Sequence, residues 1–226
     1  MNGLDYALII GIAALALLNW WSACCGKRRT FVITKPLVMI FLITLFVKIG
    51  GVKQEHFWFL FGLLASLAGD VLLLYPARWF IHGLIGFFIA QVFYIIGFSI
   101  DLPPLLPSLI ACCSIVLLLL LIFRILQREI TKNPNLQKMR FSILIYATAL
   151  STMTASAALS LFKPSWPSLA AALVTLGGFL FLSSDMMLAY DRFVKRFKFA
   201  HPLVMSTYHL AQFAIVAGVL LKISQY

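Results

Sequence analysis

Long apolar stretches of about twenty residues recur along the chain, separated by short polar segments. A helix of about 20 residues spans the roughly 30 Å hydrocarbon core of a bilayer. Inside lipid, every backbone N–H and C=O has to be bonded within its own segment, so such stretches form helices. The pattern predicts eight membrane-spanning helices near residues 4–22, 35–50, 57–75, 80–99, 105–126, 140–162, 168–190 and 201–222.

The composition agrees with a polytopic membrane protein. The 226 residues are 62% hydrophobic and 11% charged, and the mean hydropathy is +1.00. The polar segments between the stretches are too short for a soluble domain. We therefore expect an all-α fold, a transmembrane bundle of eight helices, in one integral membrane domain that covers residues 1–226.

The net charge of +11 lies mostly in alternate loops, which favours a role in topology over nucleic-acid binding. Fourteen of the 18 lysine and arginine residues follow odd-numbered helices: Lys27, Arg28, Arg29, Lys35, Arg78, Arg124, Arg128, Lys132, Lys138, Arg140, Arg192, Lys195, Arg196 and Lys198. The other four are Lys48, Lys53, Lys163 and Lys222. Cytoplasmic loops are rich in basic residues, so we expect both termini on the non-cytoplasmic side of a bacterial inner membrane.

Two aspartates stand inside the apolar stretches of a chain that has only 7 acidic residues. Gly69-Asp70 and Ser184-Asp185 share one pattern: a small residue, Asp, two apolar residues, Leu, any residue and Tyr. A charged side chain at the bilayer centre costs about 2.5–3.5 kcal/mol even on a lenient scale. Such residues usually face a cavity and have a function, so these two form the predicted functional centre.

Other polar residues could meet the aspartates in a shared cavity. Gln91 and Tyr94 are three residues apart in the fourth predicted helix, and Tyr208 and Gln212 are four apart in the eighth, so each pair lies on one helix face. Lys35 precedes Pro36, which suits the first turn of a helix, so we expect Lys35 at the cytoplasmic surface. There it could snorkel to the headgroups, bind a lipid phosphate or pair with an aspartate. No metal-ligand spacing is present, and we expect neither a metal nor another cofactor.

In order and spacing, these residues resemble the YhhN-like lysoplasmalogenases, a family of small eight-helix membrane proteins. The matching pieces are Lys35-Pro36-Leu37, Gly69-Asp70, Phe88…Gln91…Tyr94, Tyr146 with Met153, Gly177-Gly178-Phe179, Ser184-Asp185, Arg192-Phe193 and Tyr208…Ala211-Gln212. Two positions depart from the pattern, because many relatives carry His where Gln91 stands and Tyr where His209 stands.

The resemblance implies an enzyme that hydrolyses the vinyl ether bond of a membrane lysophospholipid, a lysoplasmalogen. The products would be a fatty aldehyde and glycerophospho-ethanolamine or glycerophospho-choline. Vinyl ethers hydrolyse through protonation of carbon and an oxocarbenium ion, and two carboxylates that flank a similar cation do this work in glycosidases. Two carboxylates in a low-dielectric pocket tend to share one proton, so we expect Asp70 and Asp185 to be catalytic, either in contact or with a water between them.

Roles for the remaining residues follow from the same resemblance. Lys35 is the candidate ligand for the substrate phosphate. The other expected substrate-binding residues are Gln91, Tyr94, Tyr146, Ser184, Tyr208 and Gln212.

Two other functions fit the intramembrane acids: a small proton-coupled transporter, built on the repeated aspartate pattern, or a lipid-binding protein without catalysis. An Asp70→Asn substitution would abolish turnover in a hydrolase or proton coupling in a transporter, and would leave partner binding intact in the third case. The sequence does not indicate an oligomeric state.

Overall fold

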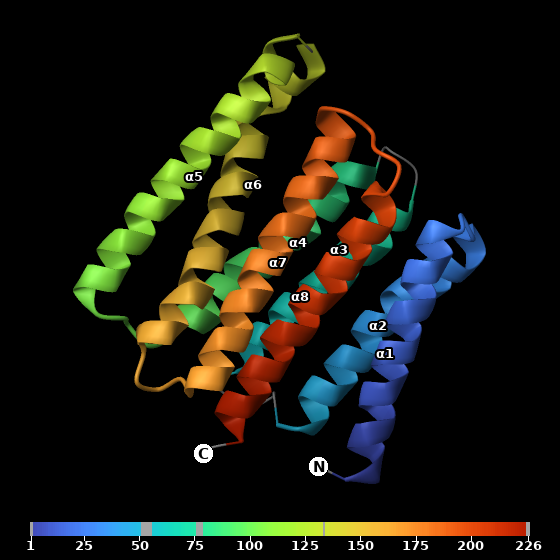
Figure 1. The fold of residues 1–226 in the computed structure, drawn as a ribbon, viewed down its shortest axis with the longest axis vertical. Helices are drawn as coiled ribbons and strands as arrows, with labels where there is room; N and C mark the ends of the chain where they lie inside the picture. Colours follow the sequence, from blue (N-terminus) through green and yellow to red (C-terminus); the bar gives the residue numbers. More distant parts are fainter. Residues whose placement is uncertain (1, 51–55, 76–78, 133, 225–226) are drawn as a thin grey trace.

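The chain forms a bundle of long α-helices (Figure 1). A computed structural model describes residues 2–50, 56–75, 79–132 and 134–224, and these ranges contain no strand. Their helices are α1 (Gly3–Cys24), α2 (Arg28–Lys48), α3 (Phe57–Leu74), α4 (Phe80–Ser99), α5 (Leu105–Lys132), α6 (Pro134–Leu159), the short 3₁₀ helix η2 (Ser160–Phe162), α7 (Ser168–Phe193) and α8 (Ala200–Ile223). The predicted all-α fold with eight α-helices is confirmed for the described part of the chain.

Seven of these helices are long and apolar enough to cross a membrane by length and composition. In α5, the corresponding apolar stretch of described residues is shorter and covers Leu105–Leu117. Large apolar side chains such as Leu105, Leu109 and Leu117 are more than half exposed, as lipid-facing side chains are in a bilayer. The protein is therefore a multi-pass membrane protein.

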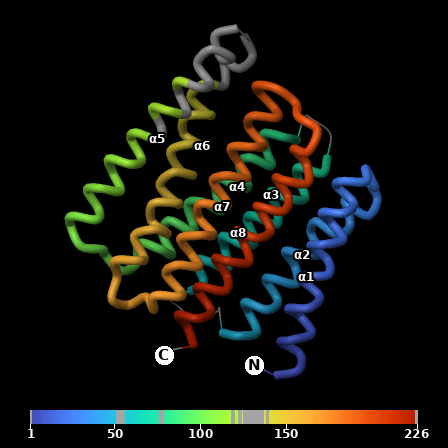
Figure 2. Tube along the Cα trace, viewed as in Figure 1, coloured from blue at the N-terminus to red at the C-terminus, as the bar shows by residue number. Residues whose placement is uncertain are grey.

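The helices pack as consecutive antiparallel pairs (Figures 1 and 2). The α3–α4 and α7–α8 pairs make up the middle of the bundle, α1–α2 packs on one side of them, and α5–α6 packs on the other. Helix α6 contacts both α4 and α7, whereas α2 contacts α3 and α8. This arrangement brings the two aspartate-bearing helices, α3 and α7, into the interior of the same bundle.

The start of α2 was predicted wrongly. The helix begins at Arg28 instead of residue 35, after a turn in which Gly26 has φ of +65°. Pro36 therefore lies inside α2, not in its first turn. The misleading signal was the proline itself, since the apolar residues Phe31, Val32 and Ile33 already continue the helix pattern before it. Two further helices exceed their predicted bounds: α5 continues to Lys132 and α6 begins at Pro134.

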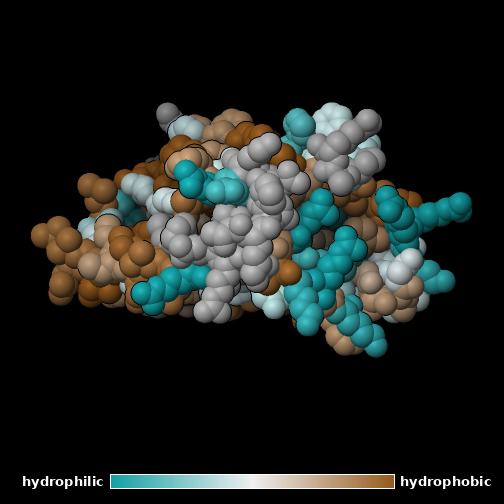
Figure 3. All heavy atoms as spheres, turned by 90° about the horizontal axis from the view of Figure 1, so that it is seen from above, coloured by the Kyte–Doolittle hydropathy of each residue, from teal (hydrophilic) through white to brown (hydrophobic). Residues whose placement is uncertain are grey.

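The start of α1 and the end of α8 lie at one end of the bundle, and the C-terminal ends of α1, α3, α5 and α7 lie at the other (Figure 1). We call the latter the basic end, because it carries the exposed residues Lys27, Arg28, Arg29, Lys195, Arg196 and Lys198. Figure 3 looks down on this end and shows hydrophilic side chains gathered on the side of α1 and α2. Lys53 and Arg78 of the predicted charge pattern lie outside the described residues. Which side of the membrane the basic end faces stays a prediction.

Helices α3 and α4 touch backbone to backbone beside Asp70. A Cβ atom on Gly86 would lie 2.9 Å from both Cα and N of Gly69, closer than real Cβ atoms approach. A Cβ on Gly62 would lie 2.3 Å from the ring of Tyr94. The glycines therefore set how closely α4 approaches the helix that carries Asp70.

A polar cluster joins the helix ends opposite the basic end. Asp101 accepts hydrogen bonds from Ser165 Oγ at 2.6 Å and from Lys222 Nζ at 3.2 Å. Lys163 is buried and donates to the carbonyl oxygen of Phe98. Burial lowers the pKa of Lys163 from its ordinary 10.5 to about 8. This lysine therefore makes the stability of the fold depend on pH.

Candidate active site

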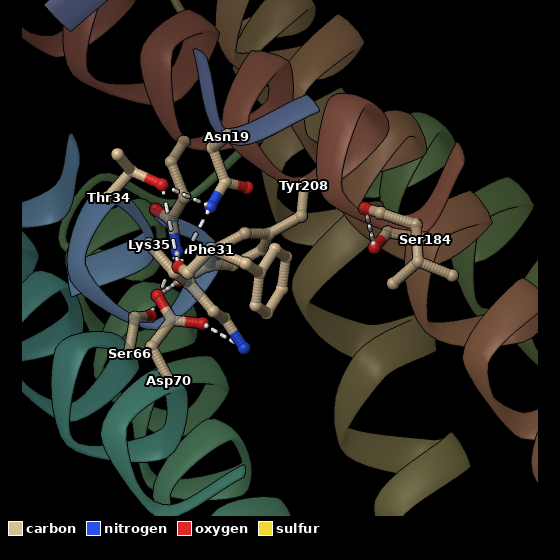
Figure 4. A network of polar contacts seen from close by, with 10 residues as sticks. Asn19, Phe31, Thr34, Lys35, Ser66, Asp70, Ser184 and Tyr208 are labelled. Atoms are coloured by element: carbon tan, nitrogen blue, oxygen red, sulfur yellow. Dashed lines mark hydrogen bonds and ion pairs between the residues drawn. The ribbon is translucent and has the colours of Figure 1, made fainter. Parts of the chain in front are cut away.

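Asp70 lies at the centre of a buried polar cluster (Figure 4). Its Oδ1 is 3.1 Å from Nζ of Lys35 on α2, and its Oδ2 accepts a hydrogen bond from the Tyr208 hydroxyl on α8 at 2.8 Å. Asp70 is fully buried and Lys35 is 3% exposed. Of the three roles left open for Lys35, the structure shows the pair with an aspartate. The expectation that Lys35 lies at the membrane surface is wrong, because α2 begins two turns earlier than predicted.

The cluster continues from Asp70 deeper into the bundle through Gln212. The Gln212 side chain donates to Ser66 Oγ at 2.9 Å and to the Tyr208 hydroxyl at 3.5 Å. Its Oε1 accepts a hydrogen bond from the Tyr94 hydroxyl at 2.7 Å. Every member is buried, so these bonds replace the water that the groups would otherwise bind. They hold Asp70 and Tyr208 in one arrangement.

Helix α1 is hydrogen-bonded to the part of α2 that carries Lys35. The amide nitrogen of Asn19 donates to the Phe31 carbonyl oxygen at 3.2 Å and to Thr34 Oγ1 at 2.9 Å (Figure 4). Thr34 directly precedes Lys35, and Asn19 is fully buried. This contact fixes α2 against α1 at the level of the ion pair.

Asp185 on α7 lies in a second polar cluster. Its Oδ2 accepts hydrogen bonds from the Tyr146 hydroxyl on α6 at 2.5 Å and from Gln91 Nε2 on α4 at 3.3 Å. Asp185 is 9% exposed. The preceding Ser184 donates to the Val204 carbonyl oxygen at 2.9 Å, so its hydroxyl joins α7 to α8 and takes no part in either aspartate cluster.

An apolar cavity of about 320 Å³ lies between α4, α6 and α7 and reaches Asp185 and Tyr146. Most of its other lining residues are aliphatic or aromatic. Ile81, Ile85 and Ile145 also line it, and each is about half exposed on the outside of the bundle. The cavity thus connects the outer surface of the bundle with the carboxyl group of Asp185. An apolar cavity with a few polar groups is typical of a ligand-binding site.

The two aspartates have separate partners. The hydrogen bonds among the described residues join neither carboxylate to the other, so of the two arrangements left open by the sequence, direct contact is not observed. Helix α4 links the clusters, because Gln91 binds Asp185 and Tyr94, one turn further, binds the network of Asp70.

Aromatic rings fill the space beside Tyr208. The Phe87 and Phe181 rings pack against it edge to face, with centroids at 5.6 and 5.7 Å. These two rings also contact each other, with centroids at 6.2 Å. The ring packing fixes the direction in which the Tyr208 hydroxyl points.

Some members of the site were not predicted. Ser66 precedes Asp70 by four residues, so a search for polar residues one turn away would have found it. Trp20 donates its indole N–H to His209 Nδ1 at 3.0 Å, a contact between α1 and α8 that no spacing along the chain indicates. Among the described residues, no group of three or more His, Cys, Asp or Glu could hold a metal ion.

Comparisons with known proteins identify relatives across most of the chain. The model of the YhhN family matches residues 30–219. The mouse protein "Lysoplasmalogenase TMEM86B" is 30% identical over 187 residues, which cover 82% of this chain and 73% of the mouse protein. The rat protein of the same name is also 30% identical over 187 residues, which cover 82% of this chain and 70% of the rat protein. No solved structure gives a significant match.

Proposed function

Because the chain belongs to the YhhN family, we propose that it is a membrane-embedded hydrolase of the vinyl ether bond of lysoplasmalogen, the activity named for its mouse and rat relatives. One water is consumed for each ether cleaved. The products are a fatty aldehyde and a glycerophospho-ethanolamine or glycerophospho-choline. The observation that carries the proposal is the meeting of Asp185 and Tyr146 with an apolar cavity that opens towards lipid.

The reaction needs an acid that can protonate carbon. The proton adds to the alkene carbon that is not bound to oxygen, and the C=C electron pair forms the new C–H bond. The neighbouring carbon becomes an oxocarbenium ion, and water adds to it and loses a proton. The hemiacetal then collapses, the glycerol oxygen leaves as the alcohol, and the carbonyl group of the aldehyde forms. One proton is taken up by carbon and one is returned by water, so the catalyst is regenerated.

Asp185 is the acid in this proposal. Both of its hydrogen-bond donors, Tyr146 and Gln91, point at Oδ2. An oxygen that accepts two hydrogen bonds is a poor place for a proton, so neutral Asp185 carries its proton on Oδ1. The carboxylate that remains after transfer lies beside the oxocarbenium ion, stabilises it and accepts the proton of the attacking water. One residue thus serves as acid and then as base.

The cavity binds the alkenyl chain. Its aliphatic lining offers no polar partner to the hydrocarbon, and its exposed edge at Ile81, Ile85 and Ile145 lets the chain enter sideways from the bilayer. A single chain fits an opening of this kind, because its free end can stay in lipid while the ether end approaches Asp185. The site therefore favours a lysolipid with one hydrocarbon chain.

Asp70 acts as a positioning residue in this proposal. Its partners Lys35 and Tyr208 use both of its oxygens, and neither residue lines the apolar cavity. Lys35, the expected phosphate ligand, has its ammonium group at Asp70 instead. Tyr94 and Gln212 support the same network. The network around Asp70 holds α3, α4 and α8 in place. The position of α4 matters for the acid, because Gln91 on α4 donates a hydrogen bond to Asp185.

The membrane orientation follows from the charges. The basic end faces the cytoplasm of a bacterial inner membrane in this proposal, and both termini lie on the other side. The cavity then receives lipid from the bilayer. The polar product leaves the site into water.

Aldehyde release from a 1-alkenyl lysophosphatidylethanolamine by the purified protein tests the proposal. Asp185→Asn removes the acid and should abolish release, whereas wild type should release aldehyde. Asp101→Asn is the matched control, because this carboxylate lies outside the apolar helices and its described partners are Ser165 and Lys222, at the helix ends opposite the basic end. Release that is unchanged in Asp185→Asn, or absent from folded wild type with several headgroups, would overturn the proposal.

A further inference from the structure

A second cavity, of about 350 Å³, lies at the basic end of the bundle. It is formed by the last turn of α1, the first turns of α2 and α8, and the end of α3. Arg28, Tyr75 and His201 supply polar groups at its rim, and Phe31 and Leu74 form part of its apolar wall. It shares no lining residue with the cavity at Asp185.

The charge of this cavity suits an anion. Arg28 and His201 line it, and no acidic residue is among the described residues that line it. The neighbouring Lys27 and Arg29 are also exposed at this end of the bundle. Asp191 also acts on His201 electrostatically, but its carboxylate accepts the Phe197 N–H at 3.1 Å. Arg28 is therefore the permanently charged side chain among the described residues that line the cavity.

Two helices begin at the cavity. Arg28 is the first residue of α2 and His201 is the second residue of α8. Neither N-cap residue, Lys27 or Phe199, supplies a side-chain hydrogen bond to its helix. The N–H of Arg28 donates to the Gly26 carbonyl oxygen at 3.0 Å, and that of Ala200 donates to the Phe197 carbonyl oxygen at 3.2 Å. The positive end of a helix dipole favours a bound anion, and here two such ends meet at a cavity that an arginine also lines.

The cavity lies directly above the Lys35–Asp70 pair. Phe31 precedes Lys35 by one helical turn and Leu74 follows Asp70 by one turn, so the cavity is roughly 6 Å closer to the basic end. Basic residues concentrate where helices leave the hydrocarbon region, so we expect this level to lie among the lipid headgroups. We propose that the basic-end cavity is a phosphate-binding site, which takes the phosphate of a lipid headgroup or of a soluble phosphate ester. The proposal does not depend on the hydrolase reaction.

Thermal stability of the protein in nanodiscs tests the site without any turnover, because a ligand that binds only the folded state raises the melting temperature. One arm adds inorganic phosphate or glycerophospho-ethanolamine to phosphatidylcholine nanodiscs, against chloride at equal ionic strength. The other arm compares nanodiscs with and without phosphatidic acid. A response in the first arm identifies a soluble ester as the ligand, and a response in the second arm alone identifies a headgroup.

Matched variants separate this site from general basic charge. Arg28→Gln and His201→Gln each remove a group that lines the cavity, whereas Arg29→Gln removes the same charge from the adjacent position, which does not line it. A lost hydrogen bond to a charged group raises the half-saturating concentration about ten-fold. We expect that increase for Arg28→Gln and His201→Gln and none for Arg29→Gln. A wild type that responds in neither arm, or an equal change in Arg28→Gln and Arg29→Gln, would overturn the proposal.

Discussion

Removing one hydroxyl from Tyr146 should slow the chemical step without disturbing the fold. The substitution Tyr146→Phe keeps the ring in the wall of the apolar cavity and deletes only the donor that lies 2.5 Å from Asp185 Oδ2. In the proposed mechanism, this hydroxyl binds a neutral acid in the ground state. In the transition state it binds a carboxylate that is forming, so the bond strengthens as the proton leaves.

The size of the effect follows from the change in that hydrogen bond. A hydrogen bond between neutral groups contributes about 0.5–1.5 kcal/mol and one to a charged group about 1.5–3 kcal/mol. The difference, about 1–1.5 kcal/mol, corresponds to a decrease of roughly 5- to 12-fold in kcat. KM should change little, because the hydroxyl is bound to Asp185 and not to the substrate.

Steady-state aldehyde release with a lysoplasmalogen, measured over a range of substrate concentrations, separates kcat from KM. Tyr190→Phe is the matched control, since Tyr190 is 43% exposed and its described ring contact is to Phe197. A kcat of Tyr146→Phe equal to that of wild type and of Tyr190→Phe would refute the reasoning. A change confined to KM would refute it equally.

Three further predictions concern the supports of the site. Lys35→Met leaves Asp70 buried without its ion pair and should lower the free energy of unfolding by about 3–5 kcal/mol. Adding Asp70→Asn should recover part of that loss, and equal stability of the single and double variants in a denaturation series would contradict the pairing. Gly86→Val places side-chain atoms against the backbone of Gly69 and should lower the free energy of unfolding by about 1–3 kcal/mol or more. An unchanged melting temperature in thermal unfolding would show that α3 and α4 do not touch there. Because burial lowers the pKa of Lys163 to about 8, the folded state holds fewer protons than the unfolded state between pH 8 and 10.5, so its contribution to stability rises with pH in that window. Lys163→Met should remove this part of the rise, and identical slopes of wild type and variant would contradict it.

The sequence predicted the fold well because membrane helices are defined by length and apolar composition. All eight predicted helices are present among the described residues, and most of their bounds agree within a few residues. The largest error, at the start of α2, came from giving Pro36 the role of a helix start. A proline inside a long helix is tolerated in membranes, where neighbouring groups can bond the freed carbonyl, so it was a weak boundary signal.

The site was harder to predict than the fold. The cost of burying charge identified Asp70 and Asp185 as special, and helical spacing placed Tyr208 and Gln212 on one face. Which cluster each residue would join depends on how the helices pack, and apolar spans carry little information about that. The pairing of Lys35 with Asp70 therefore became visible only in the folded bundle.

The source of the proton tests the central claim most directly. Wild type and Asp185→Asn would be incubated with lysoplasmalogen in D₂O, and the released aldehyde reduced at once to the alcohol and analysed by mass spectrometry. An authentic aldehyde carried through the same steps controls for exchange after release. We predict one deuterium on the carbon next to the former carbonyl in the wild-type product, and no product from Asp185→Asn. An aldehyde without deuterium, or wild-type turnover by Asp185→Asn, would contradict the assignment of Asp185 as the acid that protonates the vinyl ether.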